Sequence, residues 1–174
     1  MDYTALFINT ISLLAIVVLL GITLLFLYAL IFGAPYAPSA TNRISTMIKL
    51  LKLKKGQKVA DLGSGDGRVV IALAKEGIEA HGYEINPVLV LISRMKIRKA
   101  GLQNKAFIHF KDFWQDNFSK FDAVTIYVSP LVTGRLGKKL KREMKGGSRA
   151  VSHSFRLPNL ESVKSENNIF LYSF

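Results

Sequence analysis

Residues 59–68, which read V-A-D-L-G-S-G-D-G-R, constrain the fold of this chain more than any other stretch. A short apolar run leads into three glycines at every second position: Gly63, Gly65 and Gly67. The residues that follow stay largely apolar, without a helix breaker, up to Gly77, which is typical of a helix packed against a sheet. The pattern predicts a strand, a tight turn and a helix, the first half of a nucleotide-binding βαβ unit.

Glycine suits such a turn because it adopts positive φ without strain and because, without a Cβ, it lets a ligand approach the backbone. We expect the backbone N–H groups at the start of the helix to be free for that ligand. A glycine-rich turn alone is also compatible with a purely structural connection between strand and helix. The next strand distinguishes this interpretation from a ligand-binding turn.

The second predicted strand, residues 79–84, ends in Glu84, where a carboxylate accepts hydrogen bonds from a ribose diol. Arg68 stands where a dinucleotide fingerprint has its third glycine. Asp66 adds a carboxylate to the loop, which repels a diphosphate and favours a cationic cofactor. S-adenosylmethionine carries a sulfonium and an ammonium group, and it therefore fits this loop better than a dinucleotide.

A third predicted strand, residues 106–110, is followed by Asp112, Phe113 and Trp114. In a cofactor-binding sheet this strand end lies beside the adenine, where Asp112 accepts from the exocyclic amine and an aromatic ring covers the base. The alternative is an aspartate that caps a turn, with both aromatic rings in the core.

A fourth predicted strand, residues 121–128, leads to Ser129 and Pro130, and such strand ends face the ligand crevice of open α/β sheets. Both residues match the start of a motif that amino methyltransferases for nucleobases or glutamine carry here. Leu131 and Val132 replace its second proline and its aromatic residue. This departure disfavours a planar amide or base, and we do not expect nucleic acid as the partner.

The composition limits the remaining possibilities. The 174 residues hold 24 Lys plus Arg against 12 Asp plus Glu, a formal net charge of +12, which favours lipid head groups, nucleic acid or an acidic protein as partner. Without cysteine there is no disulfide, no thiolate metal site and no cysteine nucleophile. We interpret His81, His109 and His153 as structural, and we expect no metal.

The N-terminal stretch carries no charged residue from position 3 to position 36. Residues 6–32 are long enough to cross a bilayer of about 30 Å at about 1.5 Å per residue. A cleaved signal peptide is the alternative, but the stretch lacks a basic start and is longer than a signal core, so we expect a retained anchor. Six lysines and arginines follow within residues 43–58, which predicts a cytoplasmic C-terminal domain by the positive-inside rule.

Between anchor and domain, Pro35 and Pro38 make an extended connector that cannot continue the membrane helix. Tyr36 between them is either part of a plain linker or a border of the active site. An amphipathic helix is predicted next, with apolar residues at positions Ile44, Met47, Ile48 and Leu51. We expect it to cover the first strand of the sheet, with its lysines close to the lipid surface.

A later predicted helix has an apolar face formed by Leu136, Leu140 and Met144. Its other faces carry five basic residues: Arg135, Lys138, Lys139, Arg142 and Lys145. We interpret these as a surface for anionic lipid or an acidic partner. A fifth strand near residues 150–152 and a C-terminal hairpin complete the sheet.

These observations predict an α/β fold: a Rossmann-like class I S-adenosylmethionine-dependent methyltransferase sheet preceded by one transmembrane helix. The expected division is an anchor in residues 1–33, a connector with the amphipathic helix in residues 34–55, and the cofactor-binding domain in residues 56–174.

Taken together, the uncharged span, P-Y-x-P-S, D-L-G-S-G-D-G-R, G-Y-E-I-N-P and K-D-F-W resemble the membrane-anchored class I protein-lysine methyltransferases. The eukaryotic members of this family methylate the mitochondrial adenine nucleotide translocase and the c-subunit of ATP synthase. The resemblance covers nearly the whole chain. Its glycine loop is shared with many methyltransferases, whereas the P-Y-x-P-S connector is more specific.

The resemblance implies which residues form the two binding sites. Those around S-adenosylmethionine are Asp61, Gly63, Ser64, Gly65 and Asp66 at the methionine part, Glu84 at the ribose, and Asp112 with Phe113 at the adenine. Those that border the lysine entrance are Tyr36, Pro38, Ser129 and Pro130. Tyr36 and Ser129 are the candidate catalytic residues, because their oxygens orient the lone pair of the attacking amine.

The implied reaction is an in-line displacement by a neutral lysine amine of a membrane or membrane-associated protein. An apolar channel and the nearby sulfonium both lower the pKa of that lysine, whose usual value is about 10.4. A methyltransferase for RNA or a lipid or small-molecule amine, and a non-catalytic membrane-surface adaptor, are the alternatives. Because the N-terminus is not Arg-rich, we expect a prokaryotic cell membrane, with the mitochondrial inner membrane as the alternative.

Overall fold

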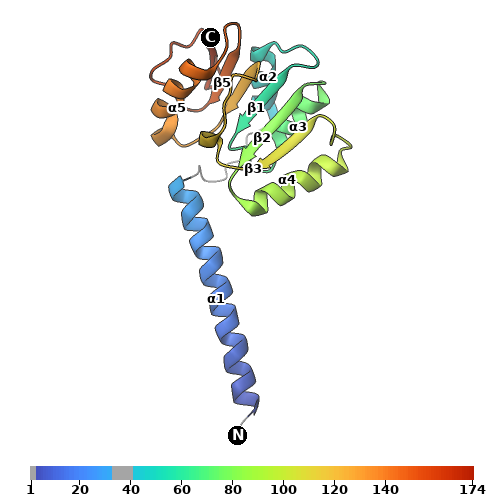
Figure 1. The fold of residues 1–174 in the computed structure, drawn as a ribbon, viewed down its shortest axis with the longest axis vertical. Coiled ribbons are helices and arrows are strands. Elements are labelled where there is room, and N and C mark those ends of the chain that lie inside the picture. The colour runs from blue at the N-terminus through green and yellow to red at the C-terminus, as the bar shows by residue number, and fades with distance from the viewer. Residues whose placement is uncertain (1–2, 33–40) are drawn as a thin grey trace.

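The computed structural model describes residues 3–32 and 41–174 (Figure 1). Tyr36 and Pro38, two of the predicted site residues, lie outside these ranges. Helix α1 (Tyr3–Phe32) extends away from a folded domain that holds all other described elements (Figure 1). Within it, the stretch Phe7–Leu25 is long and apolar enough to cross a membrane, judged by length and composition.

The domain is built on a seven-stranded sheet in the order β3-β2-β1-β4-β5-β7-β6. The strands are β1 (Lys58–Leu62), β2 (Glu79–Glu84), β3 (Ala106–Phe110), β4 (Ala123–Ile126), β5 (Arg149–His153), β6 (Lys164–Glu166) and β7 (Ile169–Ser173). The first five pair in parallel, and β7 runs antiparallel to both β5 and β6. The five predicted strands and the C-terminal hairpin are therefore confirmed.

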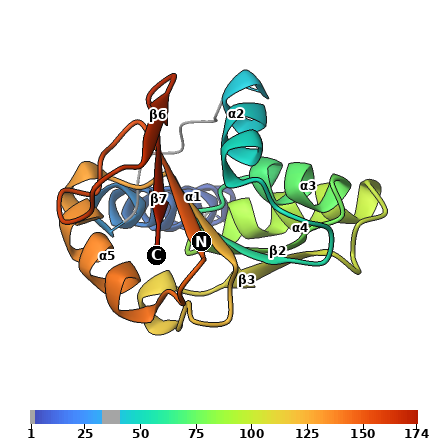
Figure 2. The same ribbon diagram turned by 90° about the horizontal axis from the view of Figure 1, so that it is seen from above.

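Two hydrophobic clusters cover the two faces of the sheet, because neighbouring strand residues point to opposite sides. Val59 belongs to the cluster with helices α2 (Thr41–Leu51), α3 (Arg68–Lys75) and α4 (Pro87–Lys99). Ala60, the next residue, belongs to the cluster with α5 (Pro130–Glu143). Figure 2 shows α2, α3 and α4 on one side of the sheet and α5 on the other.

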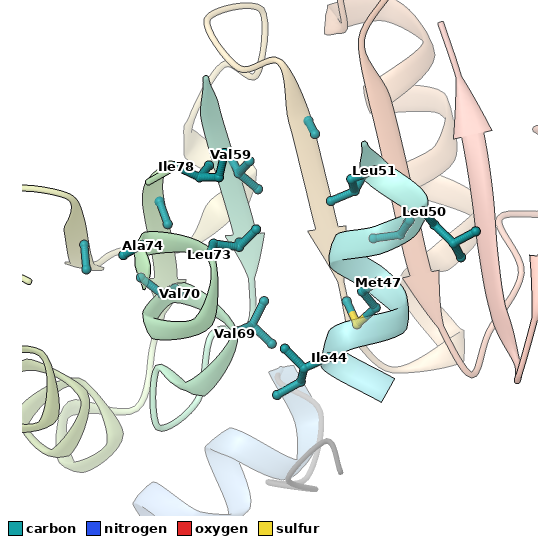
Figure 3. Packing of buried hydrophobic residues seen from close by; sticks show 14 of the residues in the cluster. Ile44, Met47, Leu50, Leu51, Val59, Val69, Val70, Leu73, Ala74 and Ile78 are labelled. Atoms are coloured by element: carbon teal, nitrogen blue, oxygen red, sulfur yellow. The ribbon is translucent and has the colours of Figure 1, made fainter. Parts of the chain in front are cut away.

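Helix α2 packs elsewhere than the sequence suggested. It contacts β5, β7 and α3, so the expectation that it covers the first strand was wrong. Its buried side chains, Ile44, Met47, Leu50 and Leu51, share one cluster with those of α3, and Ile44 lies beside Val69 of α3 (Figure 3). The division expected at residue 56 therefore separates α2 from a core to which it contributes.

Helix α5 also differs from its predicted role as a uniformly basic surface. Lys139 is buried, and its Nζ donates to Glu143 Oε1 at 2.8 Å and to the carbonyl of Asp116 at 2.7 Å. A buried lysine requires such partners, because its charge has been removed from water. The exposed basic surface of this helix is therefore smaller than its sequence indicates.

Candidate active site at the carboxyl edge of the sheet

Strand β1 lies between β2 and β4, so the chain order of the parallel strands reverses at this point of the sheet. In open α/β sheets ligands bind at such a switch point, outside the carboxyl ends of the strands. The predicted site residues that the structure describes follow β1, β2, β3 and β4, and they therefore share this edge.

The glycine turn that joins β1 to α3 has the backbone that its sequence predicted. Gly63, Gly65 and Gly67 have φ values of 72°, 55° and 77°, which L-residues with side chains adopt only under strain. A Cβ on Gly67 would lie 2.8 Å from Ser93 Cβ, so this glycine also allows α3 and α4 to approach each other.

The N–H groups of the glycine turn itself, before α3 begins, have partners within the protein. Gly63 N and Ser64 N both donate to the carbonyl oxygen of Tyr83 at 3.0 Å. Gly65 N donates to Glu84 Oε2 at 2.9 Å, and Gly67 N donates to the carbonyl of Ser64. A phosphate cradle requires such donors to point at the ligand, so this turn is poorly suited to a diphosphate.

Glu84 ends β2 with its carboxylate held over the glycine turn. Oε2 accepts from Gly65 N, and Oε1 accepts from the backbone N–H groups of Ile85 and Asn86 at 2.8 Å. The side chain is buried. Each carboxylate oxygen has two lone-pair directions, so Oε1 is fully used and Oε2 retains one direction for a ligand hydroxyl.

Asp61 lies next to the end of β1 and is the most deeply buried carboxylate of the site. Thr125 on the neighbouring β4 donates from Oγ1 to Asp61 Oδ1 at 2.6 Å. Burial raises the pKa of Asp61 to about 7; the Thr125 hydrogen bond opposes this shift, and the charges of Glu84 and Asp66 add to it. A positive ligand beside Asp61 would favour its ionised form.

Asp66 has a different environment from the one that its place in the loop suggested. Arg68 holds it through two bonds of 2.9 Å, and Lys96 of α4 donates to Oδ2 at 2.5 Å. Burial alone would raise the pKa of Asp66, but these two cations hold it well below its usual value. The carboxylate therefore ties α3 to α4 and carries little uncompensated charge for a cofactor.

Ser64 fills the space between the glycine turn and β2. A Cβ on Gly82 would lie 2.6 Å from Ser64 Oγ, so a glycine is required opposite this serine. The Ser64 hydroxyl is buried and has no hydrogen-bond partner among the described residues. This unpartnered hydroxyl lies against Gly82, the strand neighbour of Asp61, and is consistent with a polar ligand such as S-adenosylmethionine at the switch point.

After β3, Asp112 caps a turn, and the two aromatic residues that follow it are partly exposed. Asp112 Oδ1 accepts from Trp114 N at 3.0 Å and caps the 3₁₀ helix Phe113–Gln115. Phe113 and Trp114 are only partly buried, with ring centroids 4.9 Å apart, and Arg135 lies 4.3 Å from the centre of the Trp114 ring. Asp112 is thus a cap, and the aromatic rings reach the surface beside it.

Ser129 and Pro130 lie at the carboxyl end of β4, where α5 begins. Ser129 Oγ accepts from Leu131 N at 3.4 Å as the N-cap of this helix, and Pro130 occupies its first turn. Leu131, the residue after them, is 91% exposed. The hydroxyl of Ser129 has the right location for the predicted role, and its cap bond is long.

Sequence reasoning missed a polar cluster at the end of β5. His153 is buried, its Nε2 lies 2.9 Å from Arg43 Nη1, and its ring lies 4.4 Å from that of Tyr127. Burial and the positive charge of Arg43 lower the pKa of His153, so the ring is neutral at pH 7. No sequence signal joins Arg43 to a histidine 110 residues later, because only the packing of α2 brings them together.

The other two histidines have protein partners, in line with a structural role. His81 lies between Glu79 and His109, at 2.9 Å and 3.0 Å, on the face of the sheet away from the glycine turn. Tyr83 stacks on His109 and donates to Asp116. Burial and the charge of Asp116 raise the pKa of Tyr83 above its usual value.

Comparison with known proteins places this geometry in context. A family model described as the ANTKMT methyltransferase domain matches residues 61–164. The chain is 39% identical over 125 residues to the Xenopus laevis lysine N-methyltransferase for the c-subunit of ATP synthase, over 72% of this chain and 55% of the relative. The chain thus spans about half the length of that relative.

Two further proteins resemble the chain over more of their own length. It is 34% identical over 125 residues to a protein-lysine N-methyltransferase of Saccharolobus islandicus, over 71% of this chain and 78% of the relative. A crystal structure described as an RNA methyltransferase from Salinibacter ruber in complex with S-adenosyl-L-homocysteine aligns with a TM-score of 0.72 and 28% identity. It covers 78% of this chain and 91% of that one.

Proposed function

Because the chain belongs to the family of the ANTKMT methyltransferase domain, we propose that it is an S-adenosylmethionine-dependent protein-lysine N-methyltransferase acting on a membrane or membrane-associated protein. The observation that carries the proposal is the pair of buried carboxylates at the switch point. Asp61 and Glu84 lie on adjacent strands on either side of the glycine turn. The lysine methyltransferase names of the relatives support the substrate class.

S-adenosylmethionine supplies an electrophilic methyl group on a sulfonium. Glu84 binds a ribose hydroxyl through the one lone pair, on Oε2, that its three backbone donors leave available. Asp61, with a pKa of about 7, and the hydroxyl of Ser64 face the charged methionine part. Asp112 and Phe113 border the adenine, and Asp66 keeps α3 and α4 in place below the turn.

The part of the site that binds the substrate must hold a lysine amine in its neutral form, with the lone pair of the nitrogen toward the methyl group. The carbonyl of Tyr127 lies 3.4 Å from where a Cβ on Gly63 would be, so it faces the glycine turn. This carbonyl and Ser129 Oγ are acceptors for the N–H groups of the amine. Pro130 lies at the rim of the entrance, and Tyr36 and Pro38 are expected to complete it. Positioning supplies most of the rate in this arrangement.

For localisation we propose that α1 crosses a prokaryotic cell membrane and leaves the domain on the cytoplasmic side. The basic residues that follow α1 and the archaeal relative support this orientation. The mitochondrial inner membrane is the alternative, in line with the animal relative that is named for ATP synthase.

Radiolabelled S-adenosylmethionine tests the proposal. Membranes from cells that lack the chain are incubated with the full-length protein and the labelled cofactor, and label is expected in protein, on lysines identified by mass spectrometry. Glu84→Ala should abolish the label, whereas Glu79→Ala, at the other end of the same strand, should retain it.

A second candidate, an RNA methyltransferase, is favoured by the solved structure from Salinibacter ruber and by the formal charge of +12. Label in the RNA fraction instead of protein would replace the first proposal by this one, and label in lipid extracts would indicate a lipid amine. If calorimetry detects no cofactor binding to the full chain, the chain is a non-catalytic membrane-surface adaptor.

A further inference from the structure

Helix α4 has apolar residues on two faces, and only one of them is covered. Val90, Ser93 and Ile97 are buried, and the helix contacts β2 and β3. The other face carries Val88, Leu91, Ile92 and Met95, which are 55%, 61%, 36% and 63% exposed. These four follow the i, i+3, i+4, i+7 spacing of a stripe that a helix normally buries.

Further exposed apolar side chains lie at the carboxyl edge of the sheet, around the candidate active site. Phe110 ends β3, Leu131 follows β4 and Phe155 follows β5, and all three are exposed. Together with Val88, which follows β2, they place one exposed apolar residue after each of four parallel strands. Their common location at one edge of the sheet is consistent with an interaction surface there.

The charge of α4 indicates what covers its stripe. Residues 87–99 hold four basic side chains and no acidic residue. Lys96 is paired with Asp66 and Arg94 donates to the carbonyl of Ile108, which leaves Arg98 and Lys99 for a partner. An apolar stripe flanked by lysines and arginines is the pattern of a helix that lies in the interface of an anionic bilayer. A hydrophobic protein partner would explain the stripe, but it would not require this excess of positive charge.

The attachment of the anchor brings a bilayer to the same edge. The contact between Arg43 and His153 places the first turn of α2 at the carboxyl end of β5. Eight residues, 33–40, join that turn to α1, and eight residues span about 30 Å at most. Figure 1 shows α4 on the side of the domain from which α1 extends.

We propose that the domain docks on the bilayer that α1 crosses, with the stripe of Val88, Leu91, Ile92 and Met95 in the head-group layer. The mouth of the active site then opens at the membrane surface, and its substrates are lysines in the interfacial segments of membrane proteins. The inference rests on the proposed function, because it needs both the membrane anchor and a lysine substrate.

Spin labelling tests the docking directly, since the chain has no cysteine and single cysteines can be labelled without background. Leu91→Cys and Met95→Cys are made separately in the full chain, labelled with a nitroxide, and reconstituted in nanodiscs of phosphatidylcholine and phosphatidylglycerol. Val163→Cys is the matched control, because Val163 is 63% exposed and precedes β6 at the opposite edge of the sheet.

In the docked state, oxygen relaxes the labels at positions 91 and 95 more strongly than a water-soluble nickel chelate does, and the order is reversed at position 163. If the chelate reaches all three labels equally, the proposal is wrong. If the labels at positions 91 and 95 stay protected from the chelate in detergent and show spin–spin broadening, the stripe is covered by a second copy of the chain. Protection that requires an added membrane protein would assign it to that partner, and either result would overturn lipid docking.

This readout needs no methyl transfer, so it separates the docking from the proposed activity. A chain that docks but does not bind S-adenosylmethionine in calorimetry would refute the proposed function alone. A chain that fails to copurify with the nanodiscs would lack the anchor and would refute the docking.

Discussion

The residues at the carboxyl ends of β1 and β2 are hydrogen-bonded to one another, whereas β4 and β5 are each followed by an exposed apolar side chain, Leu131 and Phe155. In the first region the glycine turn, Tyr83 and Glu84 satisfy one another through backbone and carboxylate bonds of 2.9 to 3.0 Å. In the second region Ser129 makes one cap bond of 3.4 Å, and Leu131 is 91% exposed.

The two regions correspond to two requirements of group transfer, namely binding of the cofactor and access for the protein substrate. A cofactor that is the same in every cycle is bound best by groups held in place beforehand, because no free energy is then spent on ordering them. A protein substrate needs an entrance that the neighbouring chain or the membrane completes. We expect changes in the first region to alter cofactor affinity and changes in the second to alter turnover of the protein substrate.

The largest expected effect is that of Glu84→Ala on cofactor binding. Removing the acceptor of a charge-assisted bond to a ribose hydroxyl costs about 2 to 3 kcal/mol, or about 30- to 100-fold in affinity. Isothermal titration calorimetry with S-adenosylhomocysteine measures it, with a thermal melt to confirm folding. Glu79→Ala, which loses surface contacts to Lys58 and His81, should bind normally. Equal losses in both variants would remove Glu84 from the cofactor site.

Asp61→Asn tests whether this buried carboxylate recognises the positive cofactor. Its pKa of about 7 leaves it mostly protonated at pH 6 and mostly ionised at pH 8, so wild-type affinity for S-adenosylmethionine should be about tenfold higher at pH 8. The asparagine variant should show a flat profile in the same titrations. A slope that survives in Asp61→Asn would assign the pH dependence to another group.

The same pKa predicts a stability effect with a definite sign. Between the ordinary value of 3.8 and about 7, the folded protein binds more protons at Asp61 than the unfolded chain, so this group's contribution to stability falls as pH rises through that window. Denaturant titrations of wild type and Asp61→Asn at several pH values measure the difference, which should shift in favour of the variant as pH rises from about 4 to about 7 and then stay constant.

The smallest expected effect belongs to the second region. Arg43→Leu removes one hydrogen bond worth about 1 kcal/mol, so the free energy of unfolding should fall by about that amount with cofactor affinity unchanged. The pKa of His153 should rise toward its ordinary value, because a neighbouring positive charge is lost; histidine NMR titration follows it. Arg156→Leu, a guanidinium over Phe170, is the control. A matching loss of cofactor affinity would contradict the division into two regions.

The sequence by itself determined the parts of this protein that depend on local pattern. The alternation of glycines in residues 59–68, the acidic end of β2 and the apolar spacing of the helices predicted the sheet, its parallel strands and the hairpin. The uncharged stretch predicted α1. Glycine at positions 63, 65 and 67 permits the positive φ of the turn, which few other residues adopt, and all three residues have it in the structure.

Only the tertiary structure decided which partners the polar groups have. It placed Lys96 on Asp66, Arg43 on His153 and Thr125 on Asp61, contacts between residues 30, 110 and 64 positions apart. It also buried Lys139 and left the stripe of α4 uncovered. Local pattern reports the backbone preference of a segment, whereas charge pairing and burial depend on which distant segments meet when the core closes.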